Sequence, residues 1–171
     1  MEPGLFLRKK GKQVALPLKT ILLRHFREGE AAVTGQYQHT IDAKGRLFIP
    51  ARLREELGDT FYVTIAGIDP CLSVYSEESW AVFTEKFNSM PYTKARVMRP
   101  IFSYAAKCEP DAQGRILLPK ELREYAKLEK DVTVIGVSNR AEIWNAEAWA
   151  AKVAEELNPA NMAAMMEEMG F

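Results

Sequence analysis

The hydrophobic positions of this chain follow two spacings. In some short segments they alternate with polar residues, as in a strand, and in others they recur every three or four residues, as in a helix. Alternation and β-branched or aromatic residues predict strands at 37–41, 46–49, 61–66 and 72–75. The run at 51–57 follows Pro50 and ends before Gly58, which is typical of a short helix. A second helix is predicted at 76–87, with Ser76 as its N-cap. The first half of the chain is therefore predicted to run strand–turn–strand–helix–strand–strand–helix.

The same order of elements is predicted in the second half. A helix follows Pro119, strands cover 132–137 and 141–144, and Asn145 caps a last helix that contains Trp149. Each half is too small to be comfortably stable alone, so we expect the two to share one closed core that removes exposed strand edges. The predicted fold class is α+β.

The similarity of the halves extends to an unusual turn sequence. Asp42-Ala43-Lys44-Gly45-Arg46, ending at Pro50, returns 69 positions later as Asp111-Ala112-Gln113-Gly114-Arg115, ending at Pro119. Between 39–80 and 108–149 there are 13 identities in 42 positions without a gap, including Asp, Gly, Arg, Pro and Trp. This register indicates duplication, and two copies of one site favour a symmetric binding protein over a single catalytic pocket.

The repeated turn carries the candidate chemistry. Alternation places Leu47 and Ile49 on one strand face and Arg46 on the other. A guanidinium in this position can form bidentate hydrogen bonds with a phosphate or with the edge of a guanine. The aspartate accepts hydrogen bonds only, so we expect it to fix the turn or to pair with the arginine. A purely structural ion pair, formed twice, remains an alternative. The candidate DNA-binding residues are Lys44, Arg46, Arg52, Arg54 and Arg115, and the candidate turn-forming residues are Asp42, Gly45, Asp111 and Gly114.

Composition and charge narrow the classes of function. The formal net charge is zero, so nucleic-acid binding must depend on local basic clusters such as Lys94, Arg96, Arg99 and Lys107, which no acidic residue accompanies within 92–107. The two cysteines indicate reduced thiols in a reducing cytoplasm, and with His25 and His39 they form no zinc-like spacing. No apolar run reaches the roughly 20 residues of a membrane span. Neither a recurring nucleophile nor a phosphate-binding loop supports an enzyme, and no metal or cofactor is predicted.

The first 34 residues lie outside the repeat. Residues 1–27 contain seven lysines and arginines and one acid, Glu2. Pro17 and Lys19 argue against a signal peptide, because they interrupt the apolar run that such a peptide requires. A basic DNA-binding arm is a second interpretation. We favour a third hypothesis, in which translation starts at Val33 and the extension is not part of the working protein, which mass spectrometry of the native protein tests.

The last residues form a methionine-rich stretch. Met162, Met165, Met166 and Met169 fall on one helical face, with Asn161 available as a cap. The helix either folds back on its own barrel or docks on a neighbouring subunit, since methionine adapts to irregular apolar surfaces. The predicted organisation is an extension (1–34), repeat 1 (35–89), a connecting segment (90–103), repeat 2 (104–157) and a C-terminal helix (158–171).

The two D-x-x-x-R turns, in tandem with the E-x-W segments at 78–80 and 147–149, resemble the bacterial MraZ family over roughly 35–157. The resemblance implies tandem swapped-hairpin, AbrB-like repeats that form one double-split β-barrel with peripheral helices. It also implies a nucleoid-associated, ring-shaped homo-oligomer that binds double-stranded DNA sequence-specifically and regulates the division and cell-wall gene cluster. Gln113 departs from the more basic turn of the family, and residues 1–32 have no counterpart in it.

The sequence therefore predicts a cytoplasmic, non-enzymatic regulator that represses its own operon through a repeated operator upstream of its gene. Arg-tipped turns on an oligomer would contact successive grooves, and several weak sites would gain avidity together. The alternative from another class is a scaffold or adaptor whose arginine turns bind acidic protein segments.

Overall fold

The computed structural model describes residues 6–9, 12–15 and 32–171, and the chain divides into two compact units, 1–31 and 32–171. In the first unit, strand β1 (Phe6–Lys9) pairs antiparallel with β2 (Lys12–Ala15), a hairpin that the sequence analysis did not predict. Most of the basic extension, including Pro17 and Lys19, lies outside the described residues. The hypotheses of a basic arm and of a start at Val33 therefore stay predictions.

The second unit contains the two predicted halves. Repeat 1 provides β3 (Gln36–Thr40), β4 (Arg46–Phe48), α2 (Ala51–Leu57), β5 (Phe61–Ile65), β6 (Leu72–Ser76) and α3 (Glu77–Asn88). Repeat 2 provides β7 (Ala106–Cys108), β8 (Arg115–Leu117), α6 (Lys120–Tyr125), β9 (Asp131–Gly136), β10 (Ala141–Asn145) and α7 (Ala146–Glu156). The predicted order of elements is confirmed in both halves.

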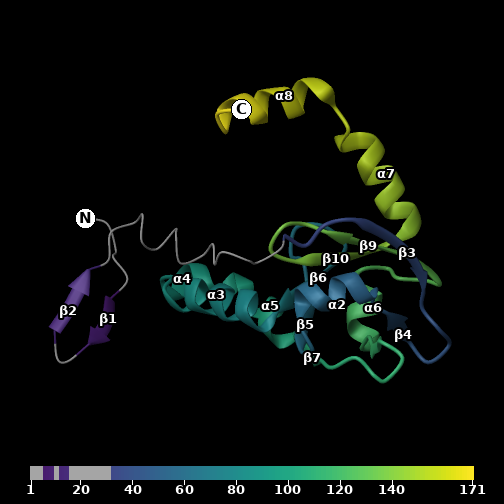
Figure 1. Cartoon of the computed structure of the whole chain (residues 1–171), viewed down its shortest axis with the longest axis horizontal. Helices are drawn as coiled ribbons and strands as arrows, with labels where there is room; N and C mark the ends of the chain where they lie inside the picture. The colour runs from purple at the N-terminus through teal and green to yellow at the C-terminus, as the bar shows by residue number, and fades with distance from the viewer. Residues whose placement is uncertain (1–5, 10–11, 16–31) are drawn as a thin grey trace. The chain divides into compact units, whose positions relative to one another are not determined.

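Six strands form one antiparallel sheet in the order β3-β9-β10-β6-β5-β7, so the halves interlock (Figure 1). The first strand of each repeat pairs with a strand of the other repeat. At the centre, Glu142 of β10 lies opposite Ser73 of β6, and these two residues are 69 positions apart. The sheet thus has an internal pseudo-two-fold axis. The described sheet remains open between its edge strands β3 and β7, so the expected closure of the core is not observed, because β4 and β8 pair with each other in a separate ribbon.

Strands β4 and β8 form a separate two-stranded ribbon, in which Leu47 lies opposite Ile116. Leu47, Ile49, Ile116 and Leu118 are at most 2% exposed and belong to the main hydrophobic core, whereas Phe48 and Leu117 are exposed. The predicted alternation is confirmed. One ribbon therefore joins the two repeats through the strands that follow the two Asp–Arg turns.

Helix α3 begins as predicted, because the Ser76 side chain accepts a hydrogen bond from the backbone N–H of Ser79. Its aromatic face packs in a cluster, with Trp80 stacked on Tyr62 at a centroid distance of 5.1 Å. Phe87 contacts Phe102 at 4.3 Å. This aromatic cluster ties α3 to the segment that connects the repeats.

The connecting segment 90–103 is helical, which the sequence analysis did not predict. It contains α4 (Tyr92–Ala95), the 3-10 helix η1 (Arg96–Met98) and α5 (Arg99–Ser103). Pro91 caps α4 and Pro100 lies in the first turn of α5, where a missing N–H costs no hydrogen bond. Packing of Ile101 against the core and of Phe102 against α3 stabilises helices too short to form alone.

Helix α7 begins at the predicted cap, since Asn145 accepts hydrogen bonds from the N–H groups of Glu147 and Ala148. The last helix, α8 (Pro159–Glu168), begins one turn earlier than predicted. Its cap is Asn158, not Asn161, because Pro159 occupies the first helical position and fixes the start. The side chains of Met162, Met165, Met166 and Met169 are 51–68% exposed, so this face of α8 does not pack on the hydrophobic core.

Candidate nucleic-acid interface

The first turn is held by its aspartate. Asp42 Oδ1 accepts hydrogen bonds from the backbone N–H groups of Lys44 and Arg46, both at 2.9 Å. The Gly45 N–H donates to the Asp42 carbonyl at 2.9 Å, and Gly45 has φ of +80°, a left-handed conformation that favours glycine. Asp42 and Gly45 therefore form the turn as predicted.

The same aspartate also holds the arginine. Arg46 Nε donates to Asp42 Oδ2 at 2.7 Å, and Arg46 Nη2 lies 2.7 Å from the same oxygen. The predicted pairing of Asp with Arg is confirmed. The Arg46 side chain is about one-third exposed, so the pair fixes its direction while the side chain stays accessible to solvent.

The second turn repeats this geometry. Asp111 Oδ1 accepts from the N–H groups of Gln113 and Arg115 at 2.9 Å, and Oδ2 accepts from Arg115 Nε at 3.0 Å and Nη2 at 2.8 Å. Gly114 has φ of +76° and donates to the Asp111 carbonyl. Both turns are thus preorganised by the same set of contacts.

These contacts shift the acidity of both aspartates. The backbone N–H of Arg115, followed by its side chain, lowers the pKa of Asp111 to about 2. The backbone N–H of Arg46 is likewise the largest cause that lowers the pKa of Asp42. Both carboxylates are charged near neutral pH, so each motif arginine faces a neutralising partner. The turn arginines alone therefore bring little net positive charge.

The ribbon places the two motif arginines on one surface. Arg46 lies opposite Leu117, and Arg115 lies opposite Phe48, all on the side of the ribbon away from the core. Phe48 also makes an edge contact with His39 at a centroid distance of 5.4 Å. The predicted sites are therefore not two distant loops but one two-stranded surface with a turn leading into each strand.

Helix arginines from the opposite repeats cover the two turn glycines. A Cβ on Gly45 would lie 3.0 Å from the Arg123 guanidinium carbon, and a Cβ on Gly114 would lie 3.1 Å from that of Arg54. The backbone holds both side chains in place, since Arg54 Nε donates to the Ile49 carbonyl and Arg123 Nε to the Leu118 carbonyl, each at 3.1 Å. Each helix arginine thus packs on the turn of the other repeat.

Arg123 was missed as a site residue by the sequence analysis, which named only its equivalent Arg54. The shared position of the two arginines in the duplication was the available signal. The helix arginines differ from the turn arginines in their ion pairs. Within 32–171, neither Arg54 nor Arg123 pairs with a carboxylate within 4.0 Å, whereas Arg46 and Arg115 both do. Arg54 and Arg123 are therefore cations beside the turns that form no ion pair within this distance.

The remaining predicted cations both belong to the first repeat. Lys44 is exposed in the first turn, where Gln113 stands in the second. Arg52 is exposed near the start of α2 and lies 3.8 Å from Glu56, a loose ion pair, and the equivalent position in α6 is Glu121. At these two positions the first repeat therefore carries a cation and the second does not.

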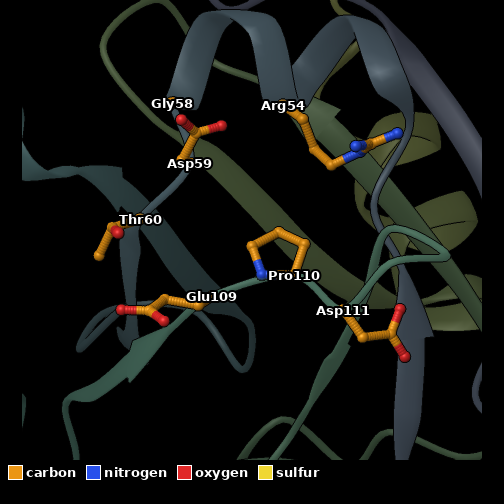
Figure 2. A pocket seen from close by; sticks show the side chains of 7 residues that line it. All are labelled: Arg54, Gly58, Asp59, Thr60, Glu109, Pro110 and Asp111. Atoms are coloured by element: carbon orange, nitrogen blue, oxygen red, sulfur yellow. The ribbon is translucent and has the colours of Figure 1, made fainter.

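A hollow of about 530 Å³ opens beside the second turn (Figure 2). Its lining includes Arg54 together with three carboxylates, those of Asp59, Glu109 and Asp111. At the first turn the positions equivalent to Asp59 and Glu109 are the uncharged Leu128 and Thr40, and the carboxylates at the equivalent lining positions are Asp42 and Glu129, with Lys127 in place of Gly58. A phosphate approaching the second turn therefore meets a more acidic surface than at the first.

Other polar groups are enclosed within the fold. Burial raises the pKa of the Cys108 thiol to about 11 and raises that of Cys71 further, so both thiols stay protonated near neutral pH. Buried Glu142 accepts hydrogen bonds from Trp144 Nε1 at 3.0 Å and Arg140 Nη2 at 2.7 Å.

Among the described residues no cluster of three His, Cys, Asp or Glu side chains has the arrangement of a metal site. The described helices are all too short or too polar to cross a bilayer.

The fold and the ribbon define a class: a duplicated α+β protein that presents two copies of one Asp–Arg turn on a single surface. The family model described as MraZ protein matches residues 32–98 and again 101–169. The chain belongs to the MraZ family.

The chain is similar to curated proteins named transcriptional regulator MraZ. The protein of Carboxydothermus hydrogenoformans is 55% identical over 118 residues, which cover 67% of this chain and 82% of the relative. The protein of Desulforamulus reducens has the same identity and coverage. The protein of Caldicellulosiruptor saccharolyticus is 48% identical over 141 residues, or 80% of this chain and 98% of the relative. The predicted family is thus confirmed.

Proposed function

We propose that this chain is a DNA-binding transcriptional regulator that contacts double-stranded DNA with the β4–β8 ribbon and its two Asp–Arg turns. The observation that carries the proposal is the shared ribbon face, on which Arg46 and Arg115 lie on neighbouring strands. A two-stranded ribbon fits the major groove, which is about 12 Å wide, and arginine is the usual reader of guanine there. The names of the relatives support the same function.

The aspartates prepare the arginines for this role. Because Asp42 and Asp111 hold Nε and Nη2, each guanidinium is fixed in direction before DNA arrives, and little side-chain freedom is lost on binding. Sequence information then comes from the turn arginines, whose charge is balanced. Affinity for the phosphate backbone comes from the cations Lys44, Arg54 and Arg123 and from Arg52.

The expected regulation follows from the family resemblance. We propose that the chain represses its own division and cell-wall gene cluster from a repeated operator upstream of its gene. Ring-shaped self-association would present several ribbons to successive DNA repeats, so that weak sites act together. The protein would act in the cytoplasm on the nucleoid, without cofactor, metal or enzymatic activity. The interlocked β4–β8 pairing supports a swapped-hairpin, AbrB-like core, and we propose that it corresponds to the double-split barrel.

The rival function is a scaffold whose arginine turns bind acidic protein segments. Binding to DNA from upstream of the chain's own gene, measured at several salt concentrations, separates the two functions. We expect a linear loss of log affinity with log salt, and a preference for direct repeats over scrambled DNA of the same length and composition. Equal binding to both DNAs, or binding that salt leaves unchanged, would contradict the proposal and favour the scaffold.

A further inference from the structure

Two segments hold most of the exposed apolar side chains. Thirteen large hydrophobic side chains are exposed in the described residues. Four lie in the connector segment, defined as 90–104, and six in the tail segment, defined as 154–171. The connector residues are Met90, Tyr92, Val97 and Tyr104, and the tail residues are Leu157, Met162, Met165, Met166, Met169 and Phe171. Such concentrations of exposed apolar surface mark interaction sites.

The two segments occupy equivalent places in the duplication. A displacement of 69 positions brings 90–102 onto 159–171, so that Phe102 corresponds to Phe171. Phe102 packs against Phe87 at 4.3 Å and against Trp80 at 5.3 Å, which closes the aromatic cluster of repeat 1. Phe171 is 83% exposed. The tail of repeat 2 therefore lacks the packing that its counterpart has.

The charges of the two segments are opposite. The connector segment contains Lys94, Arg96 and Arg99 and no acidic residue. The tail segment contains Glu155, Glu156, Glu167 and Glu168 and no basic residue. An acidic, methionine-rich helix is poorly suited to an anionic membrane surface, which selects lysine and arginine. It is well suited to a surface that combines apolar side chains with cations.

We infer that the tail segment of one copy docks on the connector segment of a second copy of this chain. Methionine side chains adapt to the irregular surface of Tyr92 and Val97, while Glu167 and Glu168 face Lys94 and Arg96. The contact joins two different surfaces, so it is head-to-tail and closes into a ring when the rotation between copies permits. The inference rests on the self-association proposed above and names the surfaces that produce it.

Charge reversal of the full-length chain tests the contact. One variant carries Lys94→Glu and Arg96→Glu, so that the connector is acidic like the tail. The other carries Glu167→Arg and Glu168→Arg, so that the end of the tail that faces the connector is basic like the connector. We expect light scattering to give an oligomer for the wild type and the 19.3 kDa monomer mass for each variant alone. An equimolar mixture should recover the oligomer, because each acidic surface then meets a basic one on the other protein.

Several results would overturn the inference. A monomeric wild type contradicts self-association as well, whereas an oligomeric wild type with unchanged variants contradicts only this contact. Variants that become monomeric but do not recover on mixing contradict a contact between copies. The control pair Lys127→Glu and Lys130→Glu reverses two exposed lysines outside both segments and should keep the wild-type mass. If a reversal variant does not fold, Lys94→Gln with Arg96→Gln replaces it, and an unchanged mass for that variant rejects the contact.

Discussion

The turn at 42–46 and the turn at 111–115 are held by the same hydrogen bonds, but the charges around them differ. In each turn one aspartate accepts two backbone N–H groups and pairs with the following arginine. The first turn carries exposed Lys44, whereas the second has Gln113 and an acidic hollow. Duplication has kept the geometry that orients an arginine while the surrounding charge has diverged. We therefore expect the first turn to contribute more to DNA affinity.

The largest expected effect concerns what the two turns share. Leu47→Ala removes a fully buried side chain that lies opposite Ile116 in the ribbon, and Ile116→Ala removes its partner. Each should lower the free energy of unfolding by roughly 2–5 kcal/mol, because both leave a cavity in the core. Chemical denaturation measures the loss. A loss in only one of the variants would mean that the ribbon is not a shared element, and Leu117→Ala, on the exposed face, is the matched control.

The second-largest expected effect is a difference between the two helix arginines in their contribution to DNA binding. Arg123→Gln removes the cation over the first turn and should weaken DNA binding uniformly across sequences, with a salt slope reduced by about 1. Arg54→Gln should change the slope less, because Asp59, Glu109 and Asp111 already oppose phosphate beside the second turn. Lys86→Gln, on α3 and outside the ribbon, the connector and the tail, controls for the loss of an exposed cation elsewhere. A larger effect of Arg54→Gln would reverse the proposed ranking of the turns.

A smaller effect tests whether the second turn can be made more like the first. Gln113→Lys restores the cation that Lys44 provides at the equivalent position. The salt slope should become steeper by about 0.9 if the new lysine neutralises one phosphate. Gln113→Glu should act in the opposite direction. Equal binding by both variants would place residue 113 outside the DNA interface.

The smallest expected effect is the pH dependence of stability that arises from the Asp111 carboxyl group in the second turn. The pKa of Asp111 is lowered to about 2 in the folded chain, from an ordinary value of 3.8. Because the folded-state pKa is depressed, this carboxylate stabilises the fold fully above about pH 4, and the contribution is lost as the pH falls toward 2. NMR titration of the carboxyl carbon measures it. In Arg115→Ala the pKa should rise only in part, since the backbone N–H of residue 115 still donates; a return to 3.8 would assign the shift to the guanidinium alone.

Local pattern was sufficient to predict most elements of this fold. Pro50 and Gly58 delimit α2, and Ser76 and Asn145 cap α3 and α7, because these signals act within a few residues. The connecting helices α4 and α5 escaped prediction because Ile101 and Phe102 stabilise them through distant contacts. The cap of α8 was misplaced at Asn161, although Pro159 gave the correct signal at Asn158.

The site was predictable only in part for the same reason. The turn residues and the Asp–Arg pairs follow from spacing, since residues four apart meet in a tight turn. The contact of Arg123 with Gly45 depends on which repeat packs against which, and no local pattern records this. The acidic character of the hollow likewise arises from Asp59 and Glu109, which come from distant parts of the chain.

The most direct test of the account is footprinting of DNA upstream of the chain's own gene with the wild type, Arg46→Ala and Arg115→Ala. Both variants should unfold cooperatively like the wild type, because these arginines lie on the solvent side of the ribbon. Arg46→Ala should lose protection of the repeats at concentrations where Arg115→Ala retains it, since one arginine contact contributes roughly 1–3 kcal/mol per site, Lys44 supports only the first turn and the acidic hollow lies beside the second. Full protection by folded Arg46→Ala would contradict the assignment of the ribbon as the DNA-binding surface.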